Sequence, residues 1–215
     1  MSRPKKRTED PASVGLELDA PAAARLAAGF GTALVFWFAF SAPYERAVAA
    51  SAGFLLRHFE SPAVTSLAAS GGEIHVDRSD FPPAAPRPGL PAADLHFNFV
   101  LLAALFALGP HPLAPRRFGR FWLAAAGLWA IHVLALVCQV ESLYATSLGP
   151  WSEANYGPLA RNFWAAAFHF YQIAGRFAAP FALWWGLGNS DFGFRISDFE
   201  IGDYPRRPRS RLKYR

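Results

Sequence analysis

Charged residues in this chain are concentrated at its two ends and in short internal segments, and four long apolar segments lie between them. Of the 215 residues, 53% are hydrophobic and only 17% are charged, whereas charged residues make up about a quarter of a typical soluble domain. A helix needs roughly 20 apolar residues to cross the hydrocarbon core of a bilayer. The pattern therefore predicts an all-α membrane protein with four transmembrane helices.

The apolar segments set the boundaries of the predicted parts. The transmembrane helices are expected at residues 25–44, 92–109, 121–140 and 159–187. The other parts are a tail (1–24), a long loop (45–91), a basic loop (110–120), a second loop (141–158) and a basic tail (188–215). The first apolar segment is long enough to remain in the membrane as an anchor, so we expect no cleavable signal peptide.

The loop 45–91 contains a predicted β-hairpin. Its first part, YERAVAASAGFLLRHFE, reads as an amphipathic helix, which we expect at the membrane interface. The run VTSLAASGGEIHVD then places two apolar–polar alternations around a Ser-Gly-Gly turn, which is a hairpin pattern. The prolines of FPPAAPRPGLPAAD favour an extended loop without regular structure. The region outside the membrane is too small for an independent core.

Lys and Arg residues beside the spans predict which side of the membrane each loop faces. They are frequent in both tails and in the 110–120 loop, whereas residues 141–161 contain only Arg161. Both termini are therefore expected in the cytoplasm and the 45–91 loop outside, with Tyr44 near the outer interface. This role also explains the net charge of +5, so we expect contact with the lipid bilayer and no nucleic-acid partner.

Polar residues seven positions apart mark one face of the fourth predicted span. Asn162, His169 and Arg176 recur with this spacing, and Gln172 lies between the last two. Seven residues are close to two helical turns, so these side chains are expected on one face. An Arg or a His inside a span costs several kcal/mol unless it meets a partner, water or a cavity.

The third predicted span has a matching pair, since His132 and Gln139 are also seven residues apart. The two sets together predict a polar seam, made of His132, Gln139, Asn162, His169, Gln172 and Arg176. One interpretation is an internal network in which Arg176 bonds to His132, to Gln139 or to carbonyl groups freed near Pro180. The other is a contact with a ligand or with another membrane protein.

A haem site is one alternative. His132 lies nine residues below Glu141, and His169 lies nine below Ala160, so the two imidazoles are expected at similar depth on adjacent helices. A bis-histidine haem b takes one imidazole from each of two such helices. The simpler interpretation is that each histidine hydrogen-bonds across the bundle. We therefore predict no cofactor and no metal, with haem b as the alternative.

A cysteine-based enzyme is the second alternative. Cys138 is the one cysteine, which excludes an internal disulfide. Arg161 and His169 fall in the same outer half of the bundle and could lower the pKa of its thiol. However, Cys138 is six residues from His132, and at about 100° per residue it points roughly 120° away from it. The alternative interpretation of Cys138 is a small buried hydrophobic residue.

The order of these features resembles a known family. A first span ending in PY is followed by LLRHFESP, the hairpin TSLAASGGEIHV and LHFNFVLLAALFALGP, and the third span contains HV and QVESLYA. Residues 30–145 thereby resemble the exosortase H-associated membrane protein family of Gram-negative bacteria. The resemblance implies a bacterial inner-membrane protein that accompanies a membrane cysteine transpeptidase, which processes C-terminal sorting signals. It transfers no catalytic residue.

Exosortases themselves use Cys, Arg and His in the order that Cys138, Arg161 and His169 reproduce. In this chain the three residues are much closer together, Gln-Val follows the cysteine, and four spans are too few. The resemblance therefore favours the accessory protein over the enzyme. We expect a non-catalytic membrane protein whose partner is an exosortase-type protease or its substrate, with a cysteine transpeptidase-like enzyme as the alternative.

Overall fold

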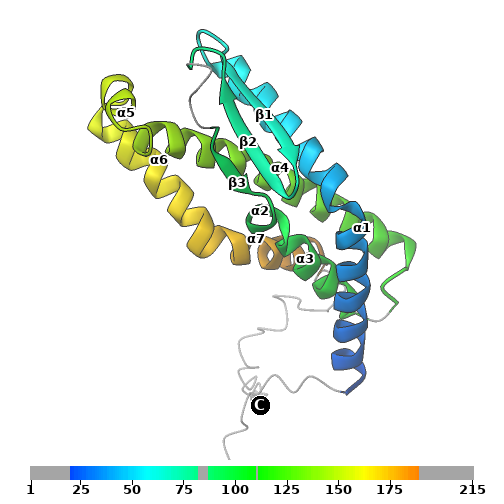
Figure 1. Ribbon diagram of the computed structural model, residues 1–215. Helices are drawn as coiled ribbons and strands as arrows, with labels where there is room; N and C mark the ends of the chain where they lie inside the picture. The colour runs from blue at the N-terminus through cyan, green and yellow to red at the C-terminus, as the bar shows by residue number, and fades with distance from the viewer. Residues whose placement is uncertain (1–19, 82–86, 110, 189–215) are drawn as a thin grey trace, which may run out of the picture.

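The computed structural model describes residues 20–81, 87–109 and 111–188 (Figure 1). The predicted cytoplasmic tails, 1–24 and 188–215, fall almost entirely outside these residues. The described part is mostly helical and contains one small antiparallel sheet, as the sequence predicts. Two of its helices, α1 (Ala20–Phe59) and α4 (Pro115–Thr146), are long and apolar enough to cross a membrane.

Helix α1 (Ala20–Phe59) joins the first predicted span and the amphipathic segment into one element that runs through Pro43. Proline cannot donate a hydrogen bond to the carbonyl four residues earlier, so it bends a helix without necessarily ending it. Figure 1 shows α1 bending between its blue and cyan parts. Most of the buried residues of α1 follow Tyr44, because the second part packs against the sheet and α4.

The predicted hairpin is confirmed. Strands β1 (Thr65–Ser70) and β2 (Glu73–Arg78) are antiparallel and are joined by Gly71 and Gly72. Both glycines have positive φ, 63° and 80°, which a tight two-residue hairpin turn requires and which glycine adopts without strain. A third strand, β3 (Gly89–Pro91), pairs with β2 inside the segment that the sequence predicts to be irregular. That prediction is wrong for these three residues.

The remaining helices form the rest of the bundle. They are α2 (Ala93–His96), α3 (Asn98–Ala107), α4 (Pro115–Thr146), α5 (Pro150–Asn155), α6 (Pro158–Phe170) and α7 (Arg176–Leu183). Two π-helical segments, η1 (Tyr171–Gly175) and η2 (Trp184–Gly188), alternate with α6 and α7, so the last helix is continuous from Pro158 to Gly188.

Two clusters of buried apolar side chains hold these elements together. The larger lies where the sheet and the second part of α1 meet α4, and Ile74, Leu136 and Tyr144 are among its members. The smaller joins α3 to α4 through Leu102 and Leu128. Polar side chains of α1, α3 and α4 also meet inside the bundle.

Candidate functional site

A chain of hydrogen bonds crosses the bundle through His132, whose side chain is completely buried in α4. The Tyr44 hydroxyl lies 2.7 Å from His132 Nδ1, and His132 Nε2 lies 2.7 Å from Asn98 Oδ1. Asn98 Nδ2 in turn donates to the carbonyl oxygen of Arg176 at 2.8 Å. The chain therefore connects α1, α4, α3 and α7.

The neighbouring groups determine which atom donates and which accepts in every bond of this hydrogen-bond chain. Because Asn98 Nδ2 donates to a carbonyl, Asn98 Oδ1 is the acceptor and His132 Nε2 carries the hydrogen. His132 Nδ1 then accepts from the hydroxyl of Tyr44. A neutral imidazole satisfies this pattern with both of its ring nitrogens in use.

Pro180 explains why the Arg176 carbonyl can accept this bond. It lies inside α7, four residues after Arg176. In a regular helix the residue at that position would donate its N–H to the Arg176 carbonyl, and proline has no N–H. A carbonyl without a partner in an apolar interior costs free energy. Asn98 supplies the missing donor.

A buried pair of ionisable residues, His96 and Glu45, lies beside this hydrogen-bond chain. Trp37 Nε1 donates to His96 Nδ1 at 3.1 Å, so the ring hydrogen of a neutral His96 is on Nε2. His96 Nε2 lies 3.3 Å from Glu45 Oε1, in an orientation that is not a hydrogen bond. The side chains of His96 and Glu45 are 1% and 8% exposed, so α1 and α2 enclose both groups.

The last helix has two further polar connections to α2. Arg176 Nη2 lies 3.4 Å from Asp94 Oδ1, and the Tyr171 hydroxyl donates to the Leu95 carbonyl at 2.7 Å. The backbone carbonyl and the side chain of Arg176 thus both contact the segment that the sequence predicts as the second span.

The structure brings together only part of the predicted polar seam. His132 and Arg176 are connected through Asn98, while Gln139 and Gln172 are half-buried. Asn162 and His169 are exposed, away from this network. The physical reason is η1, which lies between His169 and Arg176. Its wider turns shift the phase of the helix, so a spacing of seven no longer keeps these two residues on one face.

Sequence reasoning missed most of the partners in the network. Asn98 and His96 interrupt the apolar run of the second predicted span, and that interruption was the available signal. Tyr44, expected near the outer interface, is hydrogen-bonded to His132 in α4. A tyrosine at the end of an apolar segment is normally a sign of the interface, so the sequence provides no reason to expect this bond.

The residues of the two chemical alternatives are not assembled. Cys138 is half-buried, Arg161 faces Glu153 at 3.9 Å, and His169 is exposed. Within the described residues, no hydrogen bond or ion pair connects Cys138, Arg161 and His169. The residues present also do not fit a bis-histidine haem, because both ring nitrogens of His132 have hydrogen-bond partners and His169 faces away from the network.

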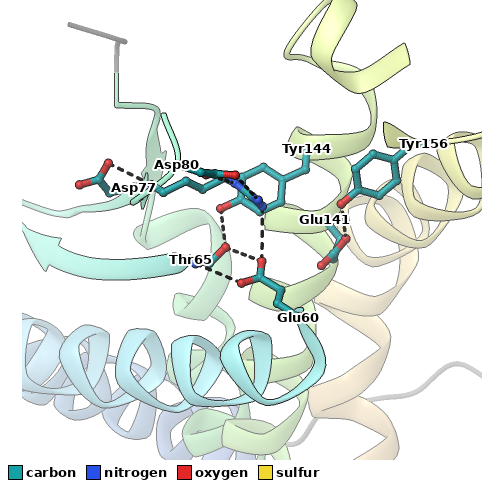
Figure 2. Close-up of polar contacts among 8 residues, drawn as sticks. Glu60, Thr65, Asp77, Asp80, Glu141, Tyr144 and Tyr156 are labelled. Atoms are coloured by element: carbon teal, nitrogen blue, oxygen red, sulfur yellow. Dashed lines mark hydrogen bonds and ion pairs between the residues drawn. The ribbon is translucent and has the colours of Figure 1, made fainter. Parts of the chain in front are cut away.

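A separate polar cluster fixes the hairpin to the helices (Figure 2). The guanidinium of Arg78 lies 4.8 Å from the ring centre of Tyr144 and 4.9 Å from that of Trp151. Asp80 accepts two hydrogen bonds from Arg78, both at 2.9 Å, and these bonds, together with the positive charge of Arg78, lower the pKa of Asp80. Glu60, shown beneath Thr65 in Figure 2, lies 3.6 Å from Arg78.

The other contacts in this cluster are made by Thr65 and Tyr156. Thr65, at the start of β1, hydrogen-bonds both Glu60 and the hydroxyl of Tyr144. Tyr156 donates to Glu141 at 3.0 Å, and burial raises the pKa of Tyr156, so the hydroxyl keeps the proton that it donates. The charged groups of this cluster are thus paired with one another, as expected for contacts that hold the hairpin against the helices.

No family model, curated protein or solved structure matches the chain. Its function therefore has to be argued from the geometry of the site. In both polar clusters, the side chains bond to other groups of the same protein. Side chains paired in this way hold helices and strands together more readily than they bind a substrate.

Proposed function

We propose that this chain is a non-catalytic accessory protein of the bacterial inner membrane that acts by binding another membrane protein. The observation that carries the proposal is the hydrogen-bond chain from Tyr44 to Arg176, which uses both nitrogens of the buried histidine. A ligand to a cofactor needs a nitrogen with a free lone pair, and a general base needs one that faces a substrate, whereas His132 Nδ1 faces the Tyr44 hydroxyl. The partner that we propose is an exosortase-type sorting protease or its substrate.

The proposed membrane arrangement has four spans. Helices α1 and α4 supply the first and third. The second is the shorter apolar segment Ala93–Ala107, and the fourth is the continuous helix Pro158–Gly188. The distribution of Lys and Arg supports cytoplasmic termini and an outer face that carries the sheet and α5.

Affinity purification tests the proposed partner. The tagged chain is isolated in mild detergent from membranes of its native host, and proteins are quantified against an untagged strain. We expect enrichment of a membrane sorting protease or of a protein with a C-terminal sorting signal. A monodisperse chain without such a partner would contradict the proposal.

The enzyme and haem alternatives have separate tests. Cys138→Ser should leave the processing of a tagged sorting substrate unchanged, because neither Arg161, which faces Glu153, nor the exposed His169 is bonded to Cys138. Loss of processing with normal protein levels would support the transpeptidase alternative. A sample purified after haem-replete expression should show no Soret band, since His132 offers no free nitrogen to the iron. A strong Soret band would overturn that assignment.

A further inference from the structure

The outward face of α6 carries a regular apolar stripe that is largely exposed. We name it the outer seam, and its members are Leu159, Phe163, Ala166 and Phe170. They follow one another at intervals of four, three and four residues. The three large side chains are between 59% and 85% exposed, and Phe163 also contacts the ring of the neighbouring Trp164. This alternation is the spacing by which one helix packs along another in a coiled coil.

Two polar residues border the outer seam. Asn162 precedes Phe163 and His169 precedes Phe170, and both side chains are exposed. Within the described residues neither makes a hydrogen bond, and the His169 ring touches only that of Phe168. This inference rests on the proposed membrane arrangement, in which polar side chains facing lipid are costly unless a partner satisfies them. The polar pair thus points to a neighbour that offers hydrogen-bonding groups.

The outer seam is not complementary to itself. Two copies of one membrane protein share their topology, so a twofold pair would pack these helices in parallel. In a parallel pair, the residue that precedes Phe163 lies opposite the residue that follows Ala166 in the partner helix. Asn162 would then face Ala167, which has no hydrogen-bonding side chain. A twofold pair of copies therefore leaves Asn162 unsatisfied.

We infer that the outer seam binds a single transmembrane helix of a different protein. Small residues in that helix accept Phe163 and Phe170, and its polar side chains lie opposite Asn162 and His169. Small residues with interhelical hydrogen bonds are the usual means by which helices associate in a bilayer, where apolar surface alone gives no preference over lipid.

Photocrosslinking in membranes tests the inference. A photoreactive phenylalanine analogue replaces Phe170, and a matched control replaces Leu134, an apolar residue of α4 that is 58% exposed. Sequencing of the adduct from position 170 should identify a transmembrane segment of another protein, and position 134 should not give that adduct. The double variant Asn162→Ala with His169→Ala should form about tenfold less adduct, because it loses two interhelical hydrogen bonds.

Each other outcome overturns the inference. An adduct of two copies of the chain, lipid adducts alone, or the same adduct from both probe positions would each do so. Extraction with alkaline carbonate separates this failure from that of the proposed function. A chain that leaves the membrane in carbonate contradicts both, whereas a chain that stays but forms only lipid adducts contradicts the outer-seam inference alone. Thermal unfolding of the double variant shows that it is folded.

Discussion

At the scale of single residues, Asn98 has the most demanding position in the chain. One side chain satisfies the buried ring N–H of His132 and the carbonyl that Pro180 leaves free. An amide is suited to this position because it carries a donor and an acceptor side by side. No hydrophobic residue can replace it without leaving two buried polar groups unpaired.

Replacing Asn98 should therefore be costly. We expect Asn98→Ala to destabilise the protein by about 1–3 kcal/mol, the usual cost of buried polar groups left without partners. Asn162→Ala, the matched control at an exposed asparagine, should change stability by less than about 0.5 kcal/mol. Thermal unfolding in detergent measures both. Equal effects of the two substitutions would argue against the hydrogen-bond chain.

The Arg78–Asp80 pair gives a pH dependence of known sign. Arg78 lowers the pKa of Asp80 below the ordinary value of 3.8, so the folded protein binds this proton less readily than the unfolded chain. The stabilisation is complete above that value and is lost as the pH falls through the lower folded pKa. Because the Asp80 side chain is 41% exposed, we expect less than about 1 kcal/mol.

The measurement compares wild type with Asp80→Asn. The wild type should lose more thermal stability than the variant between pH 6 and pH 3. Glu60, which also faces Arg78, is unchanged in the variant and serves as an internal reference. An identical loss in both proteins would show that the pair contributes nothing.

At the scale of elements, the sequence predicted the helical segments and the hairpin, because apolar length and turn chemistry are local properties. It did not predict that α1 continues through Pro43 or that the last helix contains the π-helical segment η1. Tyr171, the first residue of η1, donates to the Leu95 carbonyl, and a contact between residues so far apart in the sequence leaves no local pattern. The predicted seam is divided because its spacing of seven holds only for a regular α-helix.

The close approach of α1 and α3 leaves no room for a side chain at Gly29. A Cβ on Gly29 would overlap the side chain of Ala107, whereas Gly31 has open space around it. Gly29→Ala should destabilise the protein by about 1–3 kcal/mol through overpacking. Gly31→Ala should instead stabilise α1 by about 0.5–1 kcal/mol. Unfolding temperatures of the two variants in the same detergent test this, and a neutral Gly29→Ala would contradict the packing.

Pro180 and Asn98 should be energetically coupled. Pro180→Ala provides an N–H that can bond the Arg176 carbonyl within α7, so this carbonyl no longer depends on Asn98. We expect Asn98→Ala to cost less in the Pro180→Ala background, with a coupling of about 0.5–3 kcal/mol. A double-mutant cycle by thermal unfolding measures it. Strictly additive effects would mean that Asn98 does not replace the missing helix hydrogen bond.

At the scale of the whole molecule, the polar groups of the buried hydrogen-bond chain bond to one another, whereas the side chains of Asn162 and His169 on the outward face of the last helix do not. The buried chain from Tyr44 to Arg176 holds four helices together. The exposed Asn162 and His169 border the outer seam. The sequence predicted one stripe, and the structure separates it into a buried, hydrogen-bonded part and an exposed part. In the proposed function, the exposed part is available to a partner.

The processing of a sorting substrate in the native host tests this account most directly. The strain carries either Cys138→Ser or the double variant Phe163→Ala with Phe170→Ala, with equal amounts of each protein in the membrane. We predict normal processing with Cys138→Ser and a strong loss with the double variant, because in the proposed function the partner binds the outer seam. Lost processing with Cys138→Ser and normal processing with the double variant would contradict the account.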